Sequence, residues 1–363
     1  MSPPRTVRAA PAIPLVDAGA LVDARPETLA KIDLAFSEYG ILHVSGHGIG
    51  EADLAALYRI FAAFCARPED EKRRIARPDL WYQRGWSPPD TERAIAAGGQ
   101  GDFKECFFAA LDEPAQRDRA RFPEIHARNV WPEGLPEFAP ALRRVAAALQ
   151  DLGLAILGAC EAALGLGPGA ITRLLAGGPH VSRLLRYLPL DDAQLESGVL
   201  WGENHTDFCA LTLLPGGLFV TPEGDPLGAS APCDPRAGLF LTTRGGDEVP
   251  GTAPAGSLVV QVGQQLEILT GGRFLATPHE IRAPRTPSVA RLSLAHFMHV
   301  ATEEVLFPLE PFQSAEAVER YRPPVLAGTY DLTVLADIDL APPAARERLG
   351  YPNQARIASQ HDT

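Results

Sequence analysis

The second half of the chain is a series of short apolar segments separated by glycine and proline, and this pattern restricts the fold more than any other feature. Several short strands at close spacing, with turn residues between them, predict a β-sandwich or barrel. Seven such segments lie between His180 and His299: 183–188, 210–214, 218–221, 238–243, 257–262, 265–269 and 289–299. Segment 222–256 is the least regular and predicts a long hairpin insertion.

The first half predicts helices around an early strand at 41–45. Apolar residues recur every three or four positions in three segments: 26–39, 51–65 and 136–164. A helix as apolar as 136–164 is expected to pack against a sheet. No linker separates the halves, so we predict one α+β domain over 1–363. Its expected parts are a helix-rich N-terminal layer (12–175), a β core (176–300) and a C-terminal extension (301–363).

Composition excludes several classes of protein. The 363 residues carry a net charge of −12, and no basic run exceeds Lys72-Arg73-Arg74, which argues against nucleic acid as a partner. The five cysteines include no CxxC pair, which favours reduced thiols and a cytoplasmic location. The longest charge-free apolar stretch, 152–160, is too short to span a bilayer, and no signal peptide is evident. We therefore expect no membrane partner.

Three groups of polar residues in the β half point to chemistry. His205 and Asp207 are two positions apart, so in an extended backbone their side chains share a face. His279 follows 72 residues after Asp207, and Arg291 and Ser293 share a face of the last predicted strand. His296 is an odd number of positions from Arg291 and Ser293 on this strand, so its side chain is expected to point to the opposite face. Together these residues offer metal ligands and a cation on one side of the sheet.

Two histidines and one carboxylate leave neighbouring positions of an octahedral metal open, an arrangement typical of non-haem Fe(II) oxygenases. The open positions would receive O₂ and a chelating co-substrate. An arginine beside a hydroxyl is suited to clamp a carboxylate. A lone His-x-Asp is common by chance, a lone histidine is usually structural, and zinc accepts the same ligand types. The order of the three groups and their strand context make the combination more specific.

The motifs around these residues resemble the isopenicillin N synthase-like 2-oxoglutarate/Fe(II)-dependent dioxygenases. The shared motifs are His205-Thr206-Asp207 followed by Leu211-Thr212-Leu213-Leu214, then Gly216-Gly217-Leu218, Arg291-x-Ser293, and the N-terminal Ile13-Pro14-Leu15-Val16-Asp17 and Gly46-His47-Gly48-Ile49. The resemblance covers residues 12 to about 300. It implies a double-stranded β-helix (jelly-roll) barrel backed by the N-terminal helical layer.

The resemblance also implies roles for individual residues. It makes His205, Asp207 and His279 the ligands of Fe(II). Arg291 and Ser293 correspond to the pair that holds the distal carboxylate of 2-oxoglutarate, and Tyr187 corresponds to a residue near that co-substrate.

The sequence indicates the residues that contact the substrate less clearly than the metal and co-substrate residues. Arg183 shares a face with Tyr187 on the same predicted strand. The loop 78–101 is expected to close over the barrel mouth, which makes Arg84, Trp86 and Glu92 further candidates.

The implied activity couples oxidative decarboxylation of 2-oxoglutarate to oxidation of a small molecule, such as an amino acid or natural-product intermediate. Hydroxylation is the default outcome, with desaturation or cyclisation as other outcomes. Three alternatives stay open at this point: a 2-oxoglutarate-independent Fe(II) oxidase, an ethylene-forming-type enzyme acting on 2-oxoglutarate itself, and a non-catalytic 2-oxoglutarate or metal sensor. The chain departs from the family motif at Cys209, where a glycine is usual, and the sequence does not indicate the oligomeric state.

Overall fold

A nine-stranded sheet forms the main layer of the protein. In this computed structural model the described residues are 12–91, 103–111, 116–232, 234–342 and 345. The strands run in the order β1-β2-β11-β7-β13-β5-β4-β3, and β8 also pairs with β13. Their bounds are β1 Leu15–Asp17, β2 Ile41–Ser45, β11 Ser257–Val262, β7 Leu211–Leu214, β13 Ala290–Met298, β5 Val181–Tyr187, β4 Lys104–Ala109, β3 Gly85–Ser87 and β8 Gly217–Val220.

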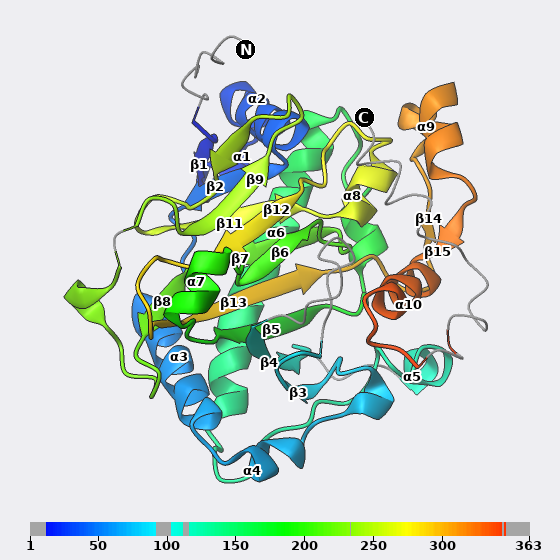
Figure 1. The fold of residues 1–363 in the computed structure, drawn as a ribbon. Helices are drawn as coiled ribbons and strands as arrows, with labels where there is room; N and C mark the ends of the chain where they lie inside the picture. Colours follow the sequence, from blue (N-terminus) through cyan, green and yellow to red (C-terminus); the bar gives the residue numbers. More distant parts are fainter. Residues whose placement is uncertain (1–11, 92–102, 112–115, 233, 343–344, 346–363) are drawn as a thin grey trace.

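A four-stranded sheet faces the large one and completes the jelly roll. Its order is β10-β9-β12-β6. The bounds are β10 Glu248–Pro250, β9 Gly238–Thr242, β12 His279–Arg282 and β6 Gly202–His205. The predicted insertion 222–256 therefore supplies both β9 and β10. A short pair, β14 Val305–Leu306 with β15 Val325–Leu326, lies outside both sheets (Figure 1).

Helices cover the outer face of the large sheet. The N-terminal helices are α1 Ala20–Asp23, α2 Pro26–Leu34 with a π-helical turn Ala35–Tyr39, α3 Glu51–Cys65, α4 Glu69–Arg73, α5 Gln116–Arg121 and α6 Phe138–Ala163. Figure 1 shows α6 running behind the sheet, where it contacts β7 and β13. Leu149 and Ile156 of α6 are fully buried. Burying each such side chain stabilises the folded state by about 1.5–3 kcal/mol relative to leaving it exposed.

Helix α6 is also the one helix within the described residues that is long and apolar enough to cross a membrane. The most apolar stretch of this helix is 56% buried inside the protein. The helix packs against α2, α3 and the sheet, which is the position expected of a core helix.

The later helices are short: α7 Asp192–Ser197, α8 Gln264–Leu269, α9 Ala315–Tyr321 and α10 Ala327–Asp337. Helices α8, α9 and α10 lie on one side of the molecule, whereas α7 lies beside β8 (Figure 1). Segment 265–269, predicted as a strand, is in fact part of α8. This short apolar run has no periodicity that distinguishes a strand from a helix. In the structure it lies in a helix of six residues whose side chains are all buried. Strands β6 and β12 and helix α10 were not predicted.

Candidate active site

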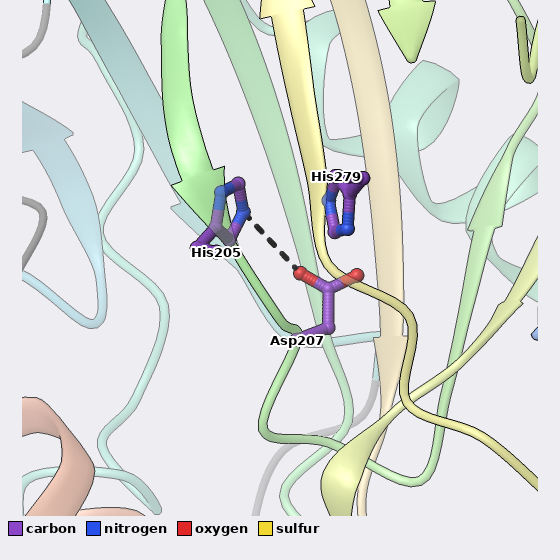
Figure 2. A group of neighbouring side chains, drawn as sticks. All are labelled: His205, Asp207 and His279. Atoms are coloured by element: carbon purple, nitrogen blue, oxygen red, sulfur yellow. Dashed lines mark ion pairs between the residues drawn. The ribbon is translucent and has the colours of Figure 1, made fainter. Parts of the chain in front are cut away.

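The two candidate histidines lie on neighbouring strands of the small sheet. β6 ends at His205 and β12 begins at His279, and the two residues are directly paired in the antiparallel register. Their ring centroids are 4.4 Å apart. Figure 2 shows both rings beside the carboxylate of Asp207, which follows β6 after one residue. Residues 72 positions apart in the chain thus meet at one point.

The three side chains converge closely enough to bind a single ion. His205 Nε2 lies 3.7 Å from Asp207 Oδ1. One potential ligand atom from each of His205, Asp207 and His279 lies within 4.8 Å of the other two. Among the described residues this is the only group of three or more histidine, cysteine or acidic side chains with that property.

The imidazoles are held in the tautomer that metal binding requires. Nδ1 of His205 donates to the carbonyl of Glu203 at 2.7 Å, and Nδ1 of His279 donates to the carbonyl of Thr277 at 3.1 Å. Because Nδ1 carries the proton, Nε2 presents its lone pair. Desolvation, with a smaller contribution from His279, lowers the pKa of His205 to about 4, so the ring is neutral at neutral pH.

Asp207 is held as a carboxylate. Burial raises its pKa, but the two histidines and a hydrogen bond from Thr212 outweigh burial and bring the pKa below its usual value. The Thr212 hydroxyl donates to Asp207 Oδ2 at 2.6 Å and lies 3.2 Å from the Cys209 sulfur. Burial raises the pKa of the Cys209 thiol well above its usual value, so Cys209 packs beside the site as a neutral thiol. Two imidazoles and one carboxylate fit Fe(II).

Helix α8 fixes the loop that carries Asp207. The backbone N–H of Gln264 donates to the carbonyl of Asp207 at 2.8 Å, and its side-chain amide donates to Thr206 Oγ1 at 2.6 Å. A Cβ at Gly263 would lie 2.1 Å from the carbonyl oxygen of Cys209, so only glycine permits this approach. Tyr330 of α10 in turn donates to Gln264 Oε1. The C-terminal extension therefore supports the loop that carries Asp207, a role that sequence reasoning missed.

A cavity of about 420 Å³ extends from His205, Asp207 and His279 between the two sheets. The predicted co-substrate residues Arg291, Ser293 and Tyr187 line it, as does Arg183. Arg291 pairs with Tyr187 across β13 and β5, and its guanidinium lies 5.7 Å from the Tyr187 ring centroid. A Cβ at Gly217 would lie 2.6 Å from the Arg291 guanidinium, so this glycine makes room for the side chain.

Arg291 is suited to an external anion. Within the described part of the chain it forms no hydrogen bond or ion pair with a protein group. A cation that faces a cavity without a protein carboxylate fits a ligand carboxylate, and the Ser293 hydroxyl lies on the same strand face. The residues therefore fit the distal carboxylate of 2-oxoglutarate. As predicted, His296 faces the other way, where its Nδ1 lies 2.9 Å from Ser182 Oγ.

Two of the predicted substrate contacts lie elsewhere. Arg84 is 2% exposed and donates to the backbone carbonyls of Ala127, Gln83 and Ile125. Trp86 is 1% exposed and donates to Glu105 at 2.8 Å. Neither is among the residues that line the cavity: both side chains point inward and hold the loop in place. Glu92 lies outside the described residues.

Lys104 is a cavity residue that sequence reasoning missed. It opens β4, pairs in register with Tyr187, and lines the cavity. Strand alternation could have placed it on the correct face, but nothing in the sequence indicated that β4 neighbours β5.

Comparison with known proteins agrees with this geometry. The family model described as the non-haem dioxygenase in morphine synthesis N-terminal matches residues 13–134. The model of the 2OG-Fe(II) oxygenase superfamily matches residues 229–300, which include His279 and Arg291. The chain thus resembles this family in both its helical layer and its barrel.

Individual relatives extend the match to most of the chain. Leucoanthocyanidin dioxygenase 1 of Oryza sativa subsp. indica is 29% identical over 314 residues, covering 83% of this chain and 74% of the relative. Homoarginine-6-hydroxylase of Arabidopsis thaliana is 26% identical over 296 residues, 78% of this chain and 80% of the relative. The crystal structure of a 2OG-Fe(II) oxygenase family protein from Caulobacter crescentus superposes with a TM-score of 0.74 at 26% identity, covering 90% of this chain and 99% of that one.

The fold and site define a non-haem iron oxygenase, and the chain belongs to the 2-oxoglutarate/Fe(II)-dependent oxygenase family. It is a 2-oxoglutarate-dependent dioxygenase, an oxidoreductase that uses Fe(II) and couples decarboxylation of 2-oxoglutarate to oxidation of a small molecule. The oxidase, ethylene-forming and sensor alternatives are not favoured, because the matching family model is that of the 2OG-Fe(II) oxygenase superfamily and the relatives named above are a dioxygenase and a hydroxylase.

Proposed function

We propose that His205, Asp207 and His279 hold the ferrous ion and that Arg291, Ser293 and Tyr187 hold 2-oxoglutarate. The observation that carries this assignment is the placement of both sets in one cavity. The three ligands converge at one end, and Arg291, with no protein carboxylate among the described residues, faces the same space. A dicarboxylate could bind the ion through one end and Arg291 through the other.

When bound, the ferrous ion supplies the activation of O₂ that converts 2-oxoglutarate to succinate and CO₂ and oxidises the substrate. The chain's own residues bind and orient the reactants. Thr212 and Gln264 hold the Asp207 loop, and the backbone carbonyls of Glu203 and Thr277 fix the histidine rings. With hydroxylation as the outcome, one oxygen atom of O₂ enters the substrate and the other enters succinate.

The substrate is a small organic molecule that occupies the rest of the cavity. A volume of about 420 Å³ suits a metabolite of modest size. Solved structures of similar fold support this size: a full-length Neurospora crassa protein is in complex with alpha-KG and thymine, and JOX2 is in complex with 2OG, Fe and JA.

The test removes ligands one at a time. We expect His279→Ala and Asp207→Ala each to weaken anaerobic Fe(II) binding and to lower succinate formation from 2-oxoglutarate by more than about 100-fold, because each loses a direct ligand. His47→Ala is the control, since this histidine lies in the segment after β2 and its side chain is not among those that line the cavity. Succinate formation at the wild-type rate by either ligand variant would refute the assignment.

A further inference from the structure

The two oxygens of the Asp207 carboxylate have different partners. Oδ1 lies 3.7 Å from Nε2 of His205, and Figure 2 shows this oxygen turned toward the histidine ring. Oδ2 accepts a hydrogen bond from the Thr212 hydroxyl at 2.6 Å. A carboxylate can bind an ion through one oxygen or through both. Here the protein already engages one of the two, so Oδ1 is the oxygen that is open to an ion.

A second hydrogen bond orients the Thr212 hydroxyl. Its oxygen lies 3.2 Å from the sulfur of Cys209. Because Thr212 gives its single proton to Asp207, and an ionised carboxylate only accepts, the thiol must be the donor in this contact. Gln261 lies opposite Thr212 on the paired strands β11 and β7, but within the described residues it forms no hydrogen bond with Thr212. The hydrogen bonds therefore point in one direction, from Cys209 to Thr212 to Asp207, an arrangement that we call the relay.

The relay is almost closed to water. Thr212 and Cys209 are each 1% exposed. At such a depth solvent does not replace a lost partner, and hydrogen bonds in series strengthen one another. Without the thiol, the Thr212 oxygen would have no donor, and its hydroxyl would be held less firmly in the orientation that bonds Asp207.

The backbone around Cys209 fixes the direction of its thiol. The carbonyl of Cys209 accepts from the N–H of Gln265 in α8 at 3.0 Å. The next residue, Ala210, donates to the carbonyl of Met298 at 2.8 Å and accepts from the N–H of Gly263 at 3.0 Å. The relay therefore begins at a backbone position that α8 and the last long strand hold from two sides.

We propose that Thr212 and Cys209 are positioning residues that make Asp207 a ligand through one oxygen and so keep three positions of the ion open. This inference rests on the proposed function. Two histidines and one carboxylate oxygen occupy three of the positions of an octahedral ion. The chelating co-substrate requires two of the remaining positions and O₂ requires one. A carboxylate bound through both oxygens would take a fourth position and leave too few for both reactants.

The relay is tested first in the metal-free protein by infrared spectroscopy. The S–H stretching band of Cys209 is identified by its disappearance in Cys209→Ala. We expect this band to move to higher frequency in Thr212→Val, because the thiol loses its acceptor, and to stay in place in Thr212→Ser, which keeps the hydroxyl. The bands of the other cysteines are internal controls. A Cys209 band that does not move in Thr212→Val would overturn the inference.

Anaerobic titrations then connect the relay to the ion. The Kd for 2-oxoglutarate is followed through the charge-transfer absorption of its Fe(II) complex, and the Kd for Fe(II) is measured separately. We expect the Kd for 2-oxoglutarate to rise at least about tenfold in Thr212→Val and about fivefold in Cys209→Ala, with partial recovery in Cys209→Ser, which keeps a donor. Cys160→Ala, which removes a buried thiol of α6, is the control and should change neither Kd.

The ratio of the two losses distinguishes positioning from general damage to the loop. We expect the Kd for Fe(II) to rise less than the Kd for 2-oxoglutarate, because Oδ1 remains a ligand in both variants. Equal losses of the two affinities in Thr212→Val, or an unchanged Kd for 2-oxoglutarate in Cys209→Ala, would overturn the inference and leave the metal site standing. If Asp207→Ala binds Fe(II) as tightly as wild type, the proposed function itself fails, and this inference falls with it.

Discussion

The two faces of the β4–β5 strand pair hold buried charges in opposite ways. On the helix side, Glu105 is 2% exposed and accepts hydrogen bonds from Lys72 at 2.6 Å, Trp86 at 2.8 Å and Arg186 at 2.9 Å. On the cavity side, the same strands present Lys104 and Arg183 toward the cavity that His205, Asp207 and His279 also line. The first network closes on itself and is structural, whereas the second opens onto a cavity and can bind a ligand.

The largest expected effect comes from breaking the closed network. Glu105→Gln leaves the charges of Lys72 and Arg186 without a buried counter-ion, so we expect the free energy of unfolding to fall by about 3–5 kcal/mol. Urea unfolding measures this change. Glu69→Gln, which breaks an exposed pair with Arg73, is the control and should cost less than about 1 kcal/mol. Equal stability of Glu105→Gln and wild type would show that the network is not structural.

The cavity face of β13, the strand that pairs with β5, should behave in the opposite way from the closed network. Arg291→Met removes a cation that has no carboxylate partner among the described residues, so we expect the free energy of unfolding to change by less than about 1 kcal/mol. The KM for 2-oxoglutarate should rise about 30-fold, because the distal carboxylate loses its counter-ion. Steady-state succinate formation measures this KM. An unchanged KM would place the co-substrate elsewhere.

We expect acid to destabilise the protein through His296, whose side chain faces away from the cavity. Burial, with a smaller effect of His299, lowers the pKa of His296 to about 3, whereas the unfolded chain titrates near 6.5. Between pH 6.5 and 3 the imidazole of His296 is protonated in the unfolded state but not in the folded state. As pH falls through this range, His296 alone therefore lowers the free energy of unfolding by about 1.4 kcal/mol per pH unit. We expect His296→Gln to show a shallower loss in urea unfolding between pH 6.5 and 5. An identical slope would contradict this.

The smallest effect tests the support from the C-terminal helix. Tyr330→Phe removes the hydrogen bond to Gln264 and leaves a buried amide oxygen without this donor. We expect a loss of about 0.5–1.5 kcal/mol in the free energy of unfolding, with little change in the KM for 2-oxoglutarate. Thermal and urea unfolding measure the first, and succinate assays the second. A large rise in KM with unchanged stability would instead place Tyr330 among the co-substrate contacts.

The sequence contained enough to predict the site residues that lie on strands. Strand alternation correctly placed Arg291 and Ser293 on one face and His296 on the other. The order of the polar groups correctly predicted that His205, Asp207 and His279 meet. The period of a strand, which fixes the side on which a residue points, explains the first of these predictions. The second came from the resemblance to the family's His-x-Asp and later His motifs, because the period of a strand does not bring residues 72 positions apart together.

Predictions in irregular or very short segments were weaker, since no period applies there. Arg84 and Trp86 lie in or beside a turn whose side chains point inward to satisfy backbone carbonyls and Glu105. Helix α8 was predicted as a strand because a short apolar run is compatible with either structure. Lys104 was missed because its role depends on which strands become neighbours, a property that residues far apart in the chain determine together.

The proposed metal site is tested most directly by anomalous diffraction at the iron edge from crystals prepared without oxygen in the presence of Fe(II) and 2-oxoglutarate. We expect one iron peak bonded to Nε2 of His205, Nε2 of His279 and the carboxylate of Asp207, with the distal carboxylate of 2-oxoglutarate against Arg291. A peak at any other group of side chains, or no peak between these three, would contradict it.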